Sequence, residues 1–78
     1  MSKVQTYGPK EGKDPTGKID VFIYFAEARG ADGKRHSLSM YGARTPFVEF
    51  QERFREMTGQ ALEQRMREEG VWSDDEQG

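Results

Sequence analysis

Residues Lys18–Gly42, KIDVFIYFAEARGADGKRHSLSMYG, decide the fold that this chain can adopt. Two runs of apolar and alternating residues flank the dipeptide Asp32-Gly33. Asp-Gly in this setting is a strong signal for a β-hairpin with a two-residue type I′ turn. The stretch therefore predicts an antiparallel hairpin in which Ala31 faces Lys34.

This register divides the hairpin into two faces, because side chains alternate along each strand. Tyr24 lies opposite Tyr41, and Phe25 lies opposite Met40. We expect one aliphatic face to form the core, and it consists of Ile19, Val21, Ile23, Phe25, Leu38 and Met40. The other face is expected to point outward, and it consists of Phe22, Tyr24, Ala26, Ala28, Ser37, Ser39 and Tyr41.

The N-terminal residues 1–17, MSKVQTYGPKEGKDPTG, are expected to be a flexible segment, because Gly and Pro interrupt them repeatedly. Val4 to Tyr7 has the pattern of a short third strand at the hairpin edge. Residues 12–18 match the spacing of a phosphate-binding P-loop. That motif requires Ser or Thr next and a helix after it, whereas Ile19 and a strand follow, so we expect no phosphate site.

The C-terminal half is predicted to be helical. Thr45-Pro46 is a helix start signal. Phe47, Phe50, Phe54 and Met57 then form an apolar stripe at helical spacing, which would cover the aliphatic face of the hairpin.

Thr58-Gly59 interrupts this stripe, and Gly costs about 1 kcal/mol inside a helix. We therefore favour two helices, over 46–57 and 59–69, above a single long one. Gly70 is placed to end the last helix, Val71 to pack back on it and Trp72 to anchor the core or its rim. The acidic residues 73–78 are expected to be disordered. The prediction is an α+β fold with one ββα(α) domain over 18–72.

Composition limits the class of protein. The chain has 78 residues, no cysteine and a formal net charge of −2, with 33% hydrophobic and 33% charged residues. Residues 1–44 contain eight Lys and Arg and five Asp and Glu. Residues 45–78 contain four Lys and Arg and nine Asp and Glu. The start lacks an apolar run, so we expect no signal peptide, no membrane span and a cytoplasmic location.

No set of residues predicts catalysis. His36 is the only histidine, and adjacent strand residues point to opposite faces, so Ser37 turns away from it. Asp74, Asp75 and Glu76 lack the alternating ligand spacing of a calcium loop. We therefore expect a non-enzymatic protein without a metal or another cofactor.

The outward face of the hairpin is the best candidate for binding. Phe22, Tyr24 and Tyr41 would form its centre, with Lys34 and Arg35 on its rim. An exposed apolar patch rimmed by polar residues usually marks an interaction surface. The alternative is that the N-terminal segment or Trp72 covers these aromatics. The sequence does not decide between an exposed and a covered face.

Two functions suit such a face. In the first, the chain binds another protein, or a second copy of itself, and acts as an inhibitor or adaptor by covering a surface. Small proteins of phages and mobile elements have this profile, as do antitoxins and orphan subunits. In the second, the aromatics stack on single-stranded RNA or DNA while basic residues engage phosphates, namely Lys18, Arg29, Lys34, Arg35 and Arg44. The scattered cations and the acidic C-terminal half favour protein binding.

Overall fold

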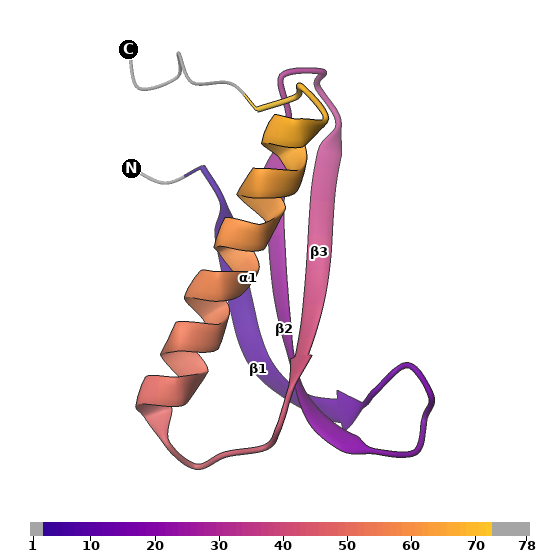
Figure 1. Cartoon of the computed structure of the whole chain (residues 1–78), viewed down its shortest axis with the longest axis vertical. Helices are drawn as coiled ribbons and strands as arrows, with labels where there is room; N and C mark the ends of the chain where they lie inside the picture. The colour runs from indigo at the N-terminus through magenta and orange to yellow at the C-terminus, as the bar shows by residue number, and fades with distance from the viewer. Residues whose placement is uncertain (1–2, 73–78) are drawn as a thin grey trace.

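The computed structural model describes residues 3–72, and it shows an α+β fold of two layers (Figure 1). Strands β1 (Gln5–Lys13), β2 (Asp20–Arg29) and β3 (Arg35–Gly42) form an antiparallel sheet in the order β1-β2-β3. Helix α1 (Val48–Glu68) lies along one side of this sheet and runs in the opposite direction to β3 (Figure 1). The predicted arrangement, a hairpin with a third N-terminal strand packed on a C-terminal helix, is confirmed.

Strand β1 is longer than the edge strand predicted over Val4 to Tyr7. It continues past Gly8-Pro9 through an irregularity, because Tyr7 pairs with Phe25 whereas Lys10 pairs with Ile23. Two residues of β1 thus stand against one of β2, which is the pattern of a β-bulge. The sheet therefore includes much of the segment expected to be flexible, while residues 73–78 lie outside the described residues.

The loop between β2 and β3 differs from the predicted type I′ turn. The Gly30 N–H donates to the Lys34 carbonyl at 2.8 Å, and the Gly33 N–H donates to the Gly30 carbonyl at 3.0 Å. Gly33 has a φ of 80°, whereas Asp32 does not have a positive φ. This is a three-residue loop with glycine in the left-handed position, and Gly30, not Ala31, faces Lys34.

The extra loop residue shifts the register by one, so the predicted pairing is wrong. Tyr24 pairs with Met40 and Phe25 with Ser39. A shift of one residue exchanges the faces of a strand relative to its neighbour. Along β2, α1 covers the face predicted to be outward, where Tyr24, Ala26 and Ala28 are buried.

The predicted aliphatic core is accordingly split. Leu38 packs against the core beneath α1, and Met40 stands opposite the buried Tyr24. Ile23 and Phe25 alternate with the buried Tyr24, Ala26 and Ala28 and therefore face away from the helix, whereas Val21 near the beginning of β2 is buried as predicted. Ile19 lies outside the strands and is exposed.

Helix α1 is a single helix, so the predicted break at Thr58-Gly59 is wrong. Thr58 is buried in mid-helix, and its hydroxyl donates to the Phe54 carbonyl at 2.7 Å. Gly59 sits where α1 approaches β1, since a Cβ there would lie 3.1 Å from the Thr6 methyl carbon. The glycine that seemed to end the first helix thus allows α1 to approach β1 closely.

The buried side of α1 differs from the predicted stripe as well. Phe54 stacks on Tyr24 with ring centroids 5.2 Å apart, but Phe47, Phe50 and Met57 are exposed. The buried positions recur every four residues, and they are Thr58, Leu62 and Met66. The core cluster consists of Ala26, Ala28, Leu62 and Met66, with Val4, Leu38, Val71 and Trp72 packed against it.

The helix ends as the sequence predicts. Gly70 has a φ of 76°, its N–H donates to the Arg67 carbonyl and the Val71 N–H donates to the Met66 carbonyl. These two bonds form a Schellman motif. The Val71 carbonyl then accepts from the Ala31 N–H at 2.7 Å, which ties the end of the helix to the hairpin loop.

Candidate binding surface

The five residues predicted to form a binding site do not share one surface. Tyr24 is fully buried between the sheet and α1, while Phe22 is half-buried opposite Gly42. Tyr41 is exposed, as are Lys34 and Arg35. Because Arg35 begins β3 and Tyr41 is its penultimate residue, they are separated by about 20 Å of extended strand. Binding by the exposed members stays a prediction, whereas the buried Tyr24 cannot belong to an exposed surface.

Burial explains the chemistry of Tyr24. Its hydroxyl is buried and has no hydrogen-bond partner within residues 3–72. Desolvation raises the pKa of this phenol, although the nearby Arg55 guanidinium opposes the shift. Tyr24 is therefore a core residue whose polar end is unpaired among the described residues.

The side of the sheet opposite α1 carries a different set of apolar residues, which we call the open-face cluster: Tyr7, Ile23, Phe25 and Tyr41. Tyr7 pairs with Phe25, and their ring centroids lie 6.0 Å apart. Ile23 pairs with Tyr41 on the other side of β2. The cluster thus crosses all three strands, and its two tyrosines are 45% and 44% exposed.

One end of the open-face cluster is held by polar contacts. The Tyr7 hydroxyl lies 2.8 Å from a Glu27 carboxylate oxygen and 2.7 Å from the Gln5 side-chain oxygen, and it has one proton to donate. The hydrogen bond to Glu27 raises the pKa of Tyr7, and the Glu27 charge adds to this effect. Arg35 stands 3.7 Å from Glu27 on the other side. The Tyr7 ring is therefore oriented by its hydrogen bond to Glu27, which also pairs with Arg35.

The cations considered for phosphate binding are dispersed. Arg35 pairs with Glu27, and Arg29 donates to the Gly33 carbonyl at 3.2 Å. Arg44 lies 3.8 Å from Glu11 and also donates to backbone carbonyls. Lys18 and Lys34 lie beyond opposite ends of β2. The structure does not gather these cations around the open-face cluster.

A second group of exposed apolar residues runs from the residue before α1 to the middle of the helix, and we call it the helix-start patch: Phe47, Phe50 and Met57. These side chains are 58%, 52% and 42% exposed. The Phe47 and Phe50 rings meet edge to face with centroids 6.0 Å apart. Most of the predicted helix stripe is thus a surface patch.

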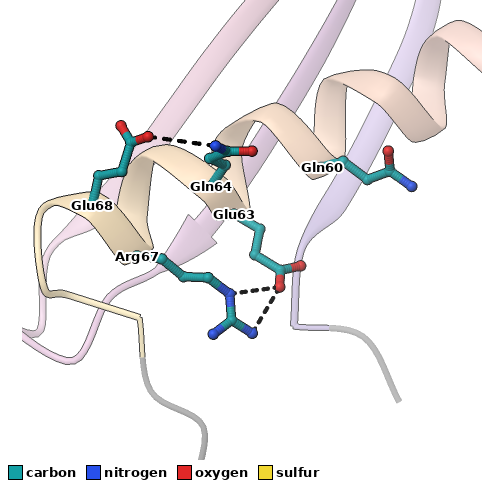
Figure 2. Close-up of a pocket in the computed structure, with 5 residues that line it drawn as sticks. All are labelled: Gln60, Glu63, Gln64, Arg67 and Glu68. Atoms are coloured by element: carbon teal, nitrogen blue, oxygen red, sulfur yellow. Dashed lines mark hydrogen bonds and ion pairs between the residues drawn. The ribbon is translucent and has the colours of Figure 1, made fainter.

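The outward side of α1 carries a shallow hollow lined by polar side chains (Figure 2). Arg67 contacts Glu63 through two nitrogens, each at 2.9 Å, and Gln64 donates to Glu68 at 3.4 Å. These pairs are four residues apart, as on an ordinary solvated helix face. Four of the five lining side chains thus pair with one another, which gives no indication of a reactive site.

His36 lies in a small polar cluster at the hairpin loop. Its Nε2 stands 3.2 Å from Asp32 and its Nδ1 stands 4.0 Å from Glu69. Asp32 also accepts the Lys34 N–H at 3.1 Å. That backbone bond, with a smaller contribution from His36, lowers the pKa of Asp32. Within residues 3–72, no three His, Asp or Glu side chains form a group suited to a metal ion.

Sequence reasoning missed three members of the open-face cluster, namely Tyr7, Ile23 and Phe25. The signal that identifies them is the series Tyr24, Ala26, Ala28, because small side chains on alternate positions allow a helix to approach a strand. The run Gly30-Ala31-Asp32-Gly33 is equally a signal for a three-residue loop ending in glycine. Together these features favour the observed register.

Comparisons of the chain with protein-family models, with curated proteins and with solved structures find no match. Helix α1 is too polar to cross a membrane, and it is the only helix in the described part of the chain.

Proposed function

We propose that this chain is a small non-catalytic protein-binding module of the inhibitor or adaptor type, which covers a partner's surface with the open face of its sheet. The observation that carries the proposal is the open-face cluster, in which Tyr7 pairs with Phe25 and Ile23 pairs with Tyr41 on one face of three paired strands. Residues on a sheet are presented by a rigid backbone, which lowers the cost of ordering the surface on binding. Tyrosine and phenylalanine are also enriched at protein interfaces.

The charges around the cluster favour a protein over a nucleic acid. Binding to phosphates requires cations that are free to replace counterions. Near the cluster, Arg35 pairs with Glu27, while Lys10 lies opposite Ile23 on β1. Lys13 pairs with Asp20 and Arg44 with Glu11. An apolar surface with dispersed cations suits another protein better than a phosphate backbone.

Partner capture from source-cell lysate, with nuclease treatment as a parallel arm, tests the proposal. Tyr7→Ser combined with Tyr41→Ser removes the two exposed ends of the cluster. We expect this variant to lose at least about 2 kcal/mol of binding if either residue is a hot spot. The matched control is Phe50→Ser combined with Met57→Ser, which removes exposed apolar surface from the helix-start patch and should leave capture unchanged.

Thermal melts accompany every variant, because only folded proteins are compared. A folded Tyr7→Ser, Tyr41→Ser protein that captures its partner as wild type does would refute the proposed surface. Loss of capture in the Phe50→Ser, Met57→Ser protein alone would assign binding to the helix-start patch. A captured species that disappears after nuclease treatment would indicate nucleic-acid binding instead.

A further inference from the structure

The two outer edges of the sheet differ in whether they accept another strand. On β1, the register shifts between Tyr7 and Lys10, and Pro9 in that interval has no N–H to donate. Bulges, proline and lysine are devices that block pairing at an edge. By contrast, β3 spans eight residues in unbroken register with β2, without proline or lysine. Only the β3 edge is open to pairing.

The hydrogen-bond pattern identifies the groups that β3 presents. Gly30 and Lys34 close the hairpin with a hydrogen bond, and bonded pairs recur at every second residue of an antiparallel ladder. The backbone groups of His36, Leu38 and Met40 therefore face β2. The outward N–H and C=O groups belong to the alternate residues Arg35, Ser37, Ser39 and Tyr41. Among residues 3–72, no strand pairs with this outer edge.

We infer that the outer edge of β3 pairs antiparallel with β3 of a second copy of this chain, which joins two sheets into one of six strands. A two-fold axis at Leu38 allows residues 35–41 of the two copies to pair along their whole length. It places Ser37 of one copy opposite Ser39 of the other. Both serines are exposed and small, so they do not obstruct the approach of the two strands.

Charge favours a second copy in the antiparallel direction. The titratable side chains of β3 other than tyrosine, Arg35 and His36, both lie at the beginning of the strand. When the two β3 strands pair antiparallel, Arg35 and His36 of one copy lie at the opposite end of the interface from Arg35 and His36 of the other copy. Arg35 of each copy then lies beside Tyr41 of the other. No like charges then face each other, which is the condition for stable cross-strand pairs. Half-buried Leu38 and Met40 also gain cover from the same strand of the second copy.

Sedimentation equilibrium and amide hydrogen exchange of the full chain, from about 1 µM to about 1 mM, test the inference over an ordinary range of dissociation constants. We expect a concentration-dependent dimer. Exchange at Ser37, Ser39 and Tyr41 should slow by about tenfold or more as the dimer forms, because these amides become hydrogen-bonded. The amides of His36, Leu38 and Met40 serve as the internal control, since β2 protects them in both states.

Two variants sharpen the test. Ser39→Pro removes an outward N–H without breaking the ladder to β2, whereas Ser39→Thr keeps that N–H. We expect the first variant to be monomeric and the second to be dimeric. Ser37→Lys combined with Ser39→Lys should also be monomeric, because these positions oppose each other across the axis.

Three results would overturn the inference. The first is a wild-type chain that stays monomeric over the full concentration range. The second is a dimer in which the amides of Ser37, Ser39 and Tyr41 exchange as fast as in the monomer, since its interface would lie elsewhere. The third is a folded double-lysine variant that still dimerises. Exchange in the wild-type chain decides the question even if Ser39→Pro fails to fold. The dimer does not depend on the proposed partner binding.

Discussion

At the scale of single residues, Tyr24 shows how an aromatic side chain belongs to the core or to a surface according to strand register alone. Its ring is nearly parallel to that of Phe54, with an interplanar angle of 16°. The side chain is fully buried, and its hydroxyl has no partner among residues 3–72. An unpaired buried hydroxyl costs about 1–3 kcal/mol, so Tyr24 stabilises the fold through its ring and not through its oxygen.

The substitution Tyr24→Phe tests this role directly. It keeps the stacked ring and removes the unpaired hydroxyl, so we expect the free energy of unfolding to rise by about 1 kcal/mol. Tyr24→Ala, as the control, should lower it by about 3–5 kcal/mol. Urea unfolding of the three proteins measures both effects. A Tyr24→Phe protein less stable than wild type would contradict the assignment, because its hydroxyl would then have a stabilising partner.

At the scale of elements, helix α1 divides into a half that packs on the sheet and a start that remains exposed. Leu62 is fully buried in the core cluster, whereas Phe50 is 52% exposed. The helical spacing of Phe47, Phe50, Phe54 and Met57 correctly indicates a helix. It does not reveal which side is buried, because Thr58 and Gly59 interrupt the apolar spacing before the buried Leu62 and Met66.

Paired substitutions in α1 test this division. Leu62→Ala should cost about 2–5 kcal/mol, which is enough to unfold much of a marginal domain. Phe50→Ala should change stability by no more than about 0.5 kcal/mol, because surface substitutions rarely do more. Thermal and denaturant melts of both variants provide the comparison. A larger loss for Phe50→Ala than for Leu62→Ala would mean that the helix packs through the predicted stripe after all.

The hairpin loop carries a prediction about pH. The pKa of Asp32 is lowered by folding, so its ionised form is stabilised in the native state. Such a group contributes stability above its unfolded pKa of about 4 and loses that contribution as the pH falls through its lowered folded pKa. Asp32→Asn should therefore be less stable than wild type at neutral pH, and the gap should close in acid.

Thermal melts of wild type and Asp32→Asn between neutral and strongly acidic pH measure this gap. Asp14 and Asp20 also have lowered pKa values, Asp14 chiefly through Thr16 and Asp20 chiefly through Lys13. Both proteins should thus lose stability in acid, and only the difference between them reports on Asp32. A difference that is constant with pH would show that ionised Asp32 has no special contacts in the fold.

At the scale of the whole molecule, the sequence predicts the class of fold but assigns the faces of the sheet incorrectly. The hairpin and the Gly70 ending follow from local signals at Gly33 and Gly70, whereas α1 begins at Val48 and not at the predicted Pro46. The face that α1 covers depends on one residue of loop length, which changes the pairing of every β3 residue with β2. Tyr24 is consequently core, and the candidate surface is the open-face cluster.

Strand β1 completes this surface, and the length of β1 depends on its pairing with β2 and not on its own sequence alone. Gly8 and Pro9 usually indicate a loop. Here they lie in the bulge between Tyr7 and Lys10, and β1 pairs with β2 on both sides of that bulge. Local sequence does not specify a bulge, because the partner strand stabilises it. Tyr7 therefore joins the candidate site only once the sheet is assembled.

The measurement that tests the face assignment most directly is a nuclear Overhauser spectrum of the aromatic side chains. We predict cross-peaks between the Tyr24 and Phe54 rings and between the Phe25 and Tyr7 rings, and no cross-peak between Phe25 and any side chain of α1. Cross-peaks from Phe25 to Phe54, with the Tyr24 ring in contact with solvent, would contradict the account, because α1 would then cover the opposite face of the sheet.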